Sequence, residues 1–244
     1  MISLIVFLIV GIAAGTLLVL RRRQPTPALK ATAVVLTLIV VAGASALALQ
    51  WSGYLTPDGM SESDRRILAI GHGLTVGRRI GAAGHGGGKI FIVCAADETE
   101  SETIAGLRIG LAMELDNEIE LLPVALKRTV RLDEDADMAL RNLLRAGDFD
   151  SALAGAMQAE ALVFAVDLPP DAARLKLWKK RERPGIYLVD AADAAIYRSA
   201  LIQGLIQGLT AVDARADLKE VRLSGDPEKA FASRCVYWDA ETVQ

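Results

Sequence analysis

Three aspartates stand where hydrophobic segments of this 244-residue chain end, and their carboxylates are the side chains best placed for chemistry: Asp97, Asp167 and Asp190. If those segments are parallel strands, the carboxylates lie along one edge of a sheet, where open α/β sheets bind ligands. There they could hydrogen-bond a polar ligand such as a sugar, or hold a hard cation such as calcium. The alternative, which the sequence favours, is that they and their neighbours cap the helices that follow.

Other groups that support catalysis or metal binding are sparse. The two histidines, His72 and His85, lie thirteen residues apart among glycines, far from either cysteine. Zinc sites usually draw on close-set His or Cys pairs, so we expect no metal. The glycine-rich segment 81–90 lacks the first glycine and the Ser/Thr of a P-loop, and a strand follows it. We therefore expect no cofactor and no enzymatic activity.

Cys94 and Cys235 form an even pair. A disulfide between them would suit a compartment outside the cytoplasm. Cys94, however, lies in an apolar segment, where a free cysteine packs as a small hydrophobic residue. The sequence leaves both states open, because the distance between the two residues decides the matter.

One segment, DAARLKLWKKRER at 171–183, is strongly basic within an acidic region. We expect a helix over 170–182. Its outer side chains could dock on an anionic lipid surface or on an acidic partner protein, with the tryptophan as anchor: Trp178, Lys179, Lys180 and Arg181. The alternative is an ordinary amphipathic helix whose leucines and tryptophan face the sheet while its charges face water.

The elements that must position these side chains alternate between short apolar segments and longer amphipathic ones. We expect strands at 89–95, 118–124, 161–167 and 185–190, and helices at 100–115, within 134–158, at 170–182 and at 192–212. Two further segments could be edge strands, 218–223 and 234–240. Apolar strands alternating with helices are typical of a parallel sheet covered on both faces. The sequence predicts an open, mainly parallel, Rossmann-like α/β sheet with helices on both faces.

Upstream, the runs 2–20 and 31–49 contain no charged residue, and each is long enough to cross the hydrocarbon core of a bilayer. The loop between them, 21–30, holds three arginines and a lysine, so the positive-inside rule places it in the cytoplasm. We expect an N-terminal transmembrane helical hairpin. Small residues on the two helices would let their backbones approach closely: Gly11 and Gly15 on the first, Ala42 and Ala46 on the second.

The chain is therefore expected to contain a hairpin (1–50), a membrane-proximal helix with a glycine-rich linker (51–88) and an extracytoplasmic α/β domain (89–244). This hairpin would hold the protein in the inner cell membrane with its domain in the periplasm; whether the second run is cleaved stays open. Residues 60–244 carry 23 basic and 29 acidic side chains. A nucleic-acid partner is not expected, because it requires a basic stripe. The expected partners are the lipid bilayer and proteins of a membrane complex.

The first expected strand and helix, KIFIVCAADETESETIAGLRIGLAMEL, resemble the beginning of a type I periplasmic binding protein, with a GxxxGL segment from Gly106 to Leu111. Segments 161–167, 184–190 and 201–209 are similar to later elements of that sugar-binding superfamily. Family members usually have two lobes that close on a ligand, whereas this chain has room for one. The resemblance thus implies one wall of a binding cleft, and a second wall would come from another subunit.

Two functions follow from these observations. The expected one is a non-catalytic, membrane-anchored accessory or scaffold subunit that presents its periplasmic-binding-protein-like domain to partner proteins of a membrane complex. The alternative is a component of a transport or sensory system that binds a small, polar, sugar-like ligand.

Overall fold

The structure is a computed structural model that describes residues 60–84, 87–127, 140–216 and 223–243. The chain divides into two compact units, Met1–Ser61 and Glu62–Gln244. The predicted hairpin, with its small residues Gly11, Gly15, Ala42 and Ala46, lies outside the described residues and stays a prediction. Among the residues that are described, no helix is both long enough and apolar enough to cross a membrane.

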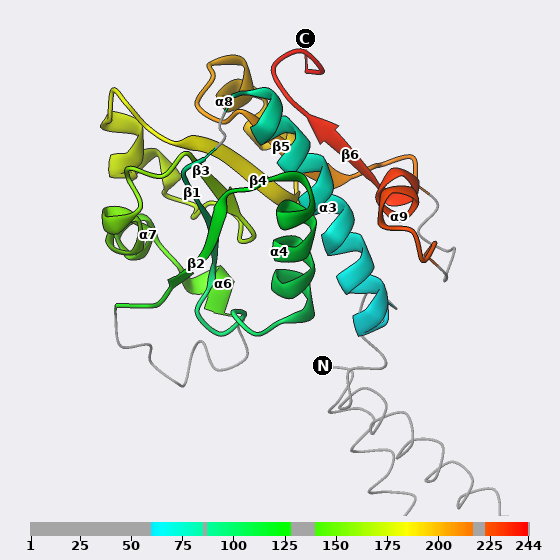
Figure 1. Ribbon diagram of the computed structural model, residues 1–244. Helices are drawn as coiled ribbons and strands as arrows, with labels where there is room; N and C mark the ends of the chain where they lie inside the picture. Colours follow the sequence, from blue (N-terminus) through cyan, green and yellow to red (C-terminus); the bar gives the residue numbers. More distant parts are fainter. Residues whose placement is uncertain (1–59, 85–86, 128–139, 217–222, 244) are drawn as a thin grey trace, which may run out of the picture. The chain divides into compact units, whose positions relative to one another are not determined.

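The second unit is built on a six-stranded sheet with the order β2-β1-β3-β4-β5-β6 (Figure 1). Its first five strands are parallel and only β6 runs antiparallel to its neighbour. In chain order the strands are β1 Lys89–Ala95, β2 Glu118–Val124, β3 Ala161–Phe164, β4 Gly185–Ala191, β5 Gly208–Val212 and β6 Cys235–Trp238. The prediction of a mainly parallel, Rossmann-like α/β sheet is confirmed.

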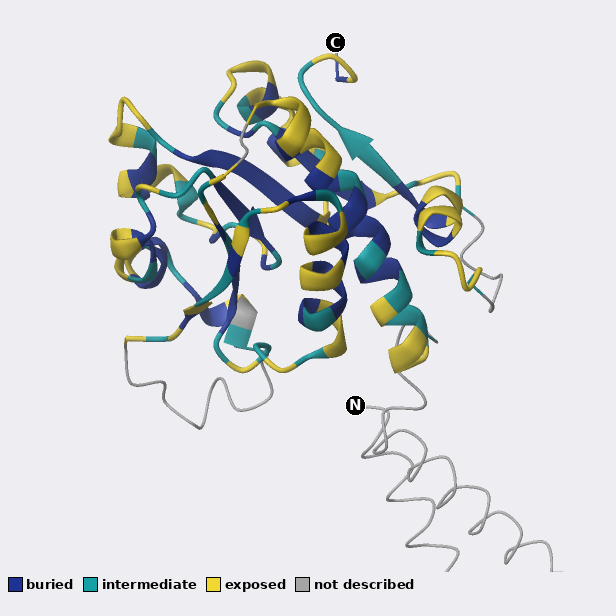
Figure 2. Cartoon of the chain, in the orientation of Figure 1, coloured by how far each residue is buried: buried dark blue, intermediate teal, exposed yellow. Residues whose placement is uncertain are grey.

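Helices cover both faces of the sheet. One face is packed by the long helices α3 Glu62–Ala82 and α4 Glu102–Glu114, with α9 Pro227–Arg234 beside α3. Shorter elements cover the other face: α6 Leu140–Leu143, α7 Ala146–Ala152, η1 Leu153–Gly155, η2 Ala172–Arg174, η3 Lys176–Lys179, η4 Ala194–Tyr197 and α8 Arg198–Ile202, where η denotes a 3-10 helix. Figure 2 shows the central strands of the sheet largely in the colour of buried residues, whereas the edge strand β6 has the colour of intermediate burial.

Two hydrophobic clusters, one on each face, follow from the alternation of side chains along the strands. In β1, Ile90, Ile92 and Cys94 pack towards α3 and α4, whereas Val93 and Ala95 join the cluster under the shorter elements. All five side chains are fully buried. The continuous apolar strands predicted from the sequence therefore reflect burial on both faces.

Helix α3 belongs to the compact unit, although it precedes the first strand. It lies against α4 at very short range, and glycines permit this approach. A Cβ atom on Gly73 would lie 2.5 Å from the backbone oxygen of Leu107, and one on Gly106 would lie 2.5 Å from that of Arg66. Real Cβ atoms do not approach backbone atoms so closely, so glycine is required at both positions.

Two predicted helices are wrong. The segment 170–182 forms the short 3-10 turns η2 and η3, since prolines flank it and the Trp178 indole N–H donates a 2.6 Å hydrogen bond to the backbone oxygen of Ala172. The segment 192–212 is interrupted after α8, where Gly204 adopts a φ of 63° and ends the helix. The rest of that segment is the parallel strand β5.

The C-terminal part contains a helix, α9, that was not predicted. Asp226 caps α9 by accepting hydrogen bonds from the backbone N–H groups of Glu228 and Lys229, and Pro227 occupies the first turn. This combination is a recognisable start signal for a helix. The strand predicted at 234–240 is confirmed as β6, whereas most of the segment 218–223 lies outside the described residues.

Candidate functional site

A groove of about 520 Å³ begins at the carboxyl ends of β4 and β5 and continues beside β6 to the C-terminal turn. Eight of its fourteen lining residues are alanines or valines, whose short side chains leave the space open. The lining residues are Ala191, Ala192, Asp193, Ala194, Ala195, Ala211, Val212, Asp213, Ala214, Arg215, Val236, Tyr237, Trp238 and Thr242. This volume lies within the range of small-molecule sites in proteins.

Two carboxylates of the groove are oriented by local turns. One side-chain oxygen of Asp193 accepts a 3.0 Å hydrogen bond from the Ala195 N–H, which starts η4. One oxygen of Asp213 accepts a 2.9 Å bond from the Arg215 N–H. Each carboxylate has a second oxygen that can accept from a ligand, and the exposed Arg215 guanidinium supplies donors. The groove thus combines an apolar lining with fixed polar groups at its margin.

The backbone beside the groove has an uncommon conformation at Asp190. This residue has a φ of 54°, the only positive value among the described non-glycine residues, and the pairing of β4 with β5 shifts register between Leu188 and Ala191. The Asp190 N–H donates a 3.0 Å hydrogen bond to the hydroxyl of Thr210. The bulge sets the direction of the chain as it enters the groove lining at Ala191.

A buried histidine supports Thr210 from the other face of the sheet. The Nδ1 atom of His72 lies 2.8 Å from the Thr210 hydroxyl, and its Nε2 atom lies 3.7 Å from Sγ of Cys235. The imidazole also makes an edge contact with Phe231 at 5.1 Å between ring centroids. Both ring nitrogens therefore have a polar partner, although His72 is only 3% exposed. We name these contacts the His72–Thr210–Asp190 network.

Burial controls the protonation of this network. It lowers the pKa of His72 below its ordinary value of 6.5, while the nearby Asp190 carboxylate acts in the opposite direction. It also raises the pKa of the Cys235 thiol to about 12, and Asp190 adds to that rise. A neutral imidazole beside a protonated thiol is no nucleophilic pair, because the thiolate is the reactive form. We therefore interpret the His72–Thr210–Asp190 network as a structural feature.

No role of His72 in the core is predicted above, but the spacing of this histidine in the sequence contains a signal for its burial. Leu68, His72 and Val76 recur at intervals of four, so they share one face of α3. Leu68 and Val76 are buried, and His72 is buried with them. A histidine on the apolar stripe of a helix must find polar partners inside the protein, since an unpaired buried polar group is costly.

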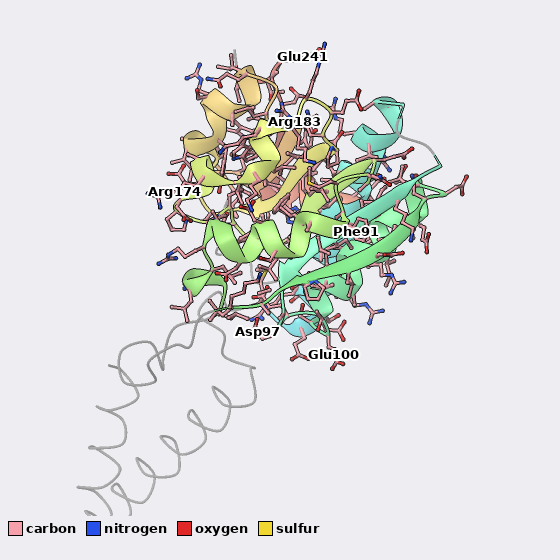
Figure 3. All side chains as sticks on the ribbon, turned by 90° about the vertical axis from the view of Figure 1, so that its left-hand side faces the viewer. Phe91, Asp97, Glu100, Arg174, Arg183 and Glu241 are labelled. Atoms are coloured by element: carbon pink, nitrogen blue, oxygen red, sulfur yellow. The ribbon has the colours of Figure 1, made fainter. Side chains whose placement is uncertain are left out.

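Of the three predicted ligand-binding aspartates, Asp97 follows β1, Asp167 follows β3, and Asp190 is the last residue but one of β4. All three are exposed. None of them lines the groove, which begins one residue beyond Asp190. Figure 3 shows Asp97 together with Glu100 at one end of the domain. The helix after Asp97 is capped by Ser101, whose hydroxyl accepts from the Ile104 N–H at 3.3 Å. Ligand binding by Asp97, Asp167 and Asp190 stays a prediction.

A tyrosine lies close to the second of these aspartates. Burial raises the pKa of the Tyr197 phenol to about 12, and the Asp167 carboxylate adds to the rise, whereas a hydrogen bond with the Leu168 backbone opposes it. Tyr197 belongs to η4, the element that begins at Asp193 of the groove. The loop after β3 and the groove margin are thereby connected through one buried ring.

The cysteines are not bridged: both are free and buried. Cys94 lies in β1 and Cys235 in β6, four strand spacings away in the sheet. At about 4.8 Å per spacing, that separation is roughly 19 Å, far beyond the reach of a disulfide. No group of three or more His, Cys, Asp or Glu side chains within the described parts of the chain is arranged to hold a metal ion.

The predicted partner-binding residues fall on η3 and on the loop before β4. Trp178 is half-buried, packs against the core and donates its indole N–H to its own chain, so it does not project as an anchor. Lys179, Lys180 and Arg181 are exposed. The structure thus separates the charged side chains, which face solvent, from the apolar ones, which face the sheet.

No protein-family model and no curated protein matches this sequence. Solved structures do show similarity. A mutant of the XylFII–LytSN complex aligns with a TM-score of 0.45 and 17% identity, over 73% of this chain and 68% of the other. A substrate-binding protein of a sugar ABC transport system from Bordetella parapertussis 12822 aligns with a TM-score of 0.45 and 13% identity, over 72% and 57%.

A sugar-binding protein of a sugar ABC transporter from Bacillus halodurans gives a TM-score of 0.44 and 12% identity, over 72% of this chain and 63% of the other. This chain therefore spans about two thirds or less of the length of the proteins it resembles. TM-scores below 0.5 establish no ligand, site or partner for it. Two of these solved structures are binding proteins of sugar ABC transport systems, the class that the sequence resemblance names.

Proposed function

We propose that the unit Glu62–Gln244 is a non-catalytic recognition domain that binds a small, polar, sugar-like ligand in the groove at the carboxyl ends of β4 and β5. The groove itself is the observation that supports this function. Its volume of about 520 Å³ suits a small molecule, and its position at the carboxyl edge is where parallel sheets bind ligands.

The groove chemistry fits a ligand with hydroxyl groups and a small apolar face. Asp193 and Asp213 can accept hydrogen bonds through their second carboxylate oxygens, and Arg215 can donate. The apolar face of the ligand would lie against the alanines, Val236 and Trp238. Because the groove is open, burial of most of the ligand surface needs a second wall, and we propose that another polypeptide supplies it.

Presentation to partner proteins, the function that the sequence favours, requires a docking surface rather than a ligand groove. The basic segment on η3 is the candidate for that role, and it is separate from the groove. Anchoring in the inner membrane with the domain in the periplasm remains part of the proposal, because it rests on the charge-free runs 2–20 and 31–49.

A substitution that fills the groove tests this function. Ala192 is exposed in the groove lining, so Ala192→Phe would occupy ligand space without disturbing the buried clusters. Ala112→Phe on the exposed side of α4 is the matched control. Isothermal titration calorimetry of the full-length protein in detergent, with a panel of pentoses and hexoses, should give a panel member that binds the wild type and the control. Its affinity for Ala192→Phe should fall at least about tenfold, which is 1.4 kcal/mol.

Two outcomes contradict this function. In one, no pentose or hexose binds the wild type at millimolar concentration. In the other, a sugar binds but Ala192→Phe and Ala112→Phe retain equal affinity, which would place the sugar site elsewhere in the molecule.

A further inference from the structure

Five exposed cationic side chains lie within eight consecutive residues of the segment that precedes β4. We call them the basic surface: Arg174, Lys176, Lys179, Lys180 and Arg181. Within the described ranges 60–84, 87–127, 140–216 and 223–243, none of the five forms an ion pair. By contrast, Arg66 pairs with Glu102, and Arg78 bridges Glu114 on α4 and Glu228 on α9. The basic surface therefore concentrates positive charge in a domain that is acidic as a whole.

The backbone beneath the basic surface is held firmly. Leu175 and Leu177 alternate with the cations and are 0% and 2% exposed. The Lys176 N–H donates a 2.8 Å hydrogen bond to the Asp150 carboxylate, and the Trp178 indole is bonded to Ala172. Arg183 closes the segment by donating to the backbone oxygen of Gly204 at 2.8 Å. A fixed backbone lowers the conformational entropy that a docking partner would have to remove.

The composition of the basic surface distinguishes between anionic partners. Peripheral membrane surfaces combine cations with apolar side chains that enter the lipid. Here Leu175, Leu177 and Trp178 face the core, and the large hydrophobic side chains that are exposed in the described parts of the chain lie on other elements. Those are Ile109, Met113, Ile196, Ile202 and Val212. The contact would therefore be ionic alone, which suits a carboxylate-rich protein surface.

We propose that the basic surface docks an acidic surface of a partner protein. The contact is electrostatic and does not involve the groove. This proposal can therefore be tested independently of the proposed ligand binding. Attraction between a compact cluster of cations and carboxylates accelerates encounter and weakens steeply with salt.

The experiment measures binding of a fluorescein-labelled decapeptide of Glu and Asp to the full-length protein in detergent, by fluorescence anisotropy at 20, 100 and 300 mM NaCl. The test variant is Lys176→Glu with Lys180→Glu. Its control, Arg108→Glu with Lys127→Glu, reverses two exposed cations that also have no ion pair among the described residues. Both variants change net charge equally, so a difference between them reports position and not total charge. Thermal unfolding of each variant checks that the fold is retained.

We expect the wild type and the control to bind the peptide within about twofold of each other, and the test variant to bind at least tenfold more weakly at 20 mM NaCl. The tenfold difference should shrink towards 300 mM NaCl, where the Debye length is short. Equal losses in the two variants would overturn the proposal, because the interaction would then depend on net charge alone. Stronger wild-type binding to vesicles with 30% phosphatidylglycerol than to the peptide would overturn it in favour of lipid.

Discussion

At the scale of single residues, the most informative group is the buried imidazole of His72. Its Nδ1 atom lies within hydrogen-bond distance of the Thr210 hydroxyl. The same hydroxyl accepts a hydrogen bond from the N–H of Asp190, whose backbone is in the left-handed region. One histidine thereby connects α3 to the strand ends at which the groove begins. A buried polar network of this kind is stabilising only while every member keeps its partner.

The depressed pKa of His72 makes stability depend on pH. In the unfolded chain the imidazole binds a proton below its ordinary pKa of 6.5, whereas the folded protein keeps it neutral to lower pH. The free energy of unfolding should therefore be unaffected by this group above pH 6.5. It should fall by up to about 1.4 kcal/mol per pH unit as the pH drops from 6.5 towards 5. Urea unfolding of the full-length protein, followed by tryptophan fluorescence, measures this slope.

The variant His72→Asn should have lower stability at pH 7.5 but should lose the slope between pH 6.5 and 5. His85→Asn is the control and should keep the wild-type slope. If His72→Asn and the wild type showed parallel pH profiles, some other group would be responsible for the dependence.

At the scale of elements, the close contact between α3 and α4 determines how one face of the sheet is covered. Glycines on both helices make the contact, and backbone atoms of the opposite helix fill the space in which a Cβ would lie. The sequence contains the spacing, since Gly73 and Gly77 on α3 match Gly106 and Gly110 on α4. Small residues at intervals of four let two helices approach closely, in water as in a membrane.

Gly73→Ala should destabilise the domain by about 1–3 kcal/mol, because the new methyl group must push apart two backbones that cannot yield easily. Gly147→Ala in α7 is the matched control, since a Cβ there meets nothing within 4 Å. It should be neutral or stabilising by about 0.5–1 kcal/mol, because alanine favours a helix over glycine. Midpoints of urea unfolding at pH 7.5 compare the two. A loss for Gly73→Ala no greater than that for Gly147→Ala would contradict the tight packing.

At the scale of the whole molecule, the N-terminal sequence predicts where the domain works. Two charge-free runs of nineteen residues flank a short loop with four basic residues, which predicts a hairpin with that loop in the cytoplasm. The groove and the basic surface would then both operate in the periplasm. A periplasmic location would suit both the proposed binding of a small ligand and the proposed contact with a partner protein.

Fusion of alkaline phosphatase after Gln244 should give an active enzyme, because its disulfides form only outside the cytoplasm. Replacing Arg21, Arg22, Arg23 and Lys30 by glutamine should reduce that activity, since the orienting charges are lost. The same replacement at Arg108, Lys127, Lys176 and Lys180 should leave it unchanged. An inactive fusion that is present in normal amounts would place the domain in the cytoplasm and rule out a periplasmic function.

The architecture of the domain could be predicted from the amino-acid sequence. Apolar strands such as 89–95 and 118–124, alternating with helices, predicted a parallel sheet buried on both faces, and the bounds of β1 and β2 agree with the prediction to the residue. The prediction succeeds because a strand that is buried on both faces is hydrophobic at nearly every position, which can be seen in the sequence. The sequence likewise placed Asp97, Asp167 and Asp190 at the ends of strands, because the ends of apolar segments mark the sheet edge.

The position of the groove and the contacts between distant polar groups could not be predicted from the sequence. The strand β5 was hidden inside a predicted helix, since LIQGLIQGL has a helical pattern until Gly204 ends it. Without β5, the neighbours of β4 and the position of the groove could not be derived. His72 and Thr210 are 138 residues apart, and their contact depends on how α3 crosses the sheet. Local sequence specifies local conformation, whereas contacts between distant segments follow from packing of the whole chain.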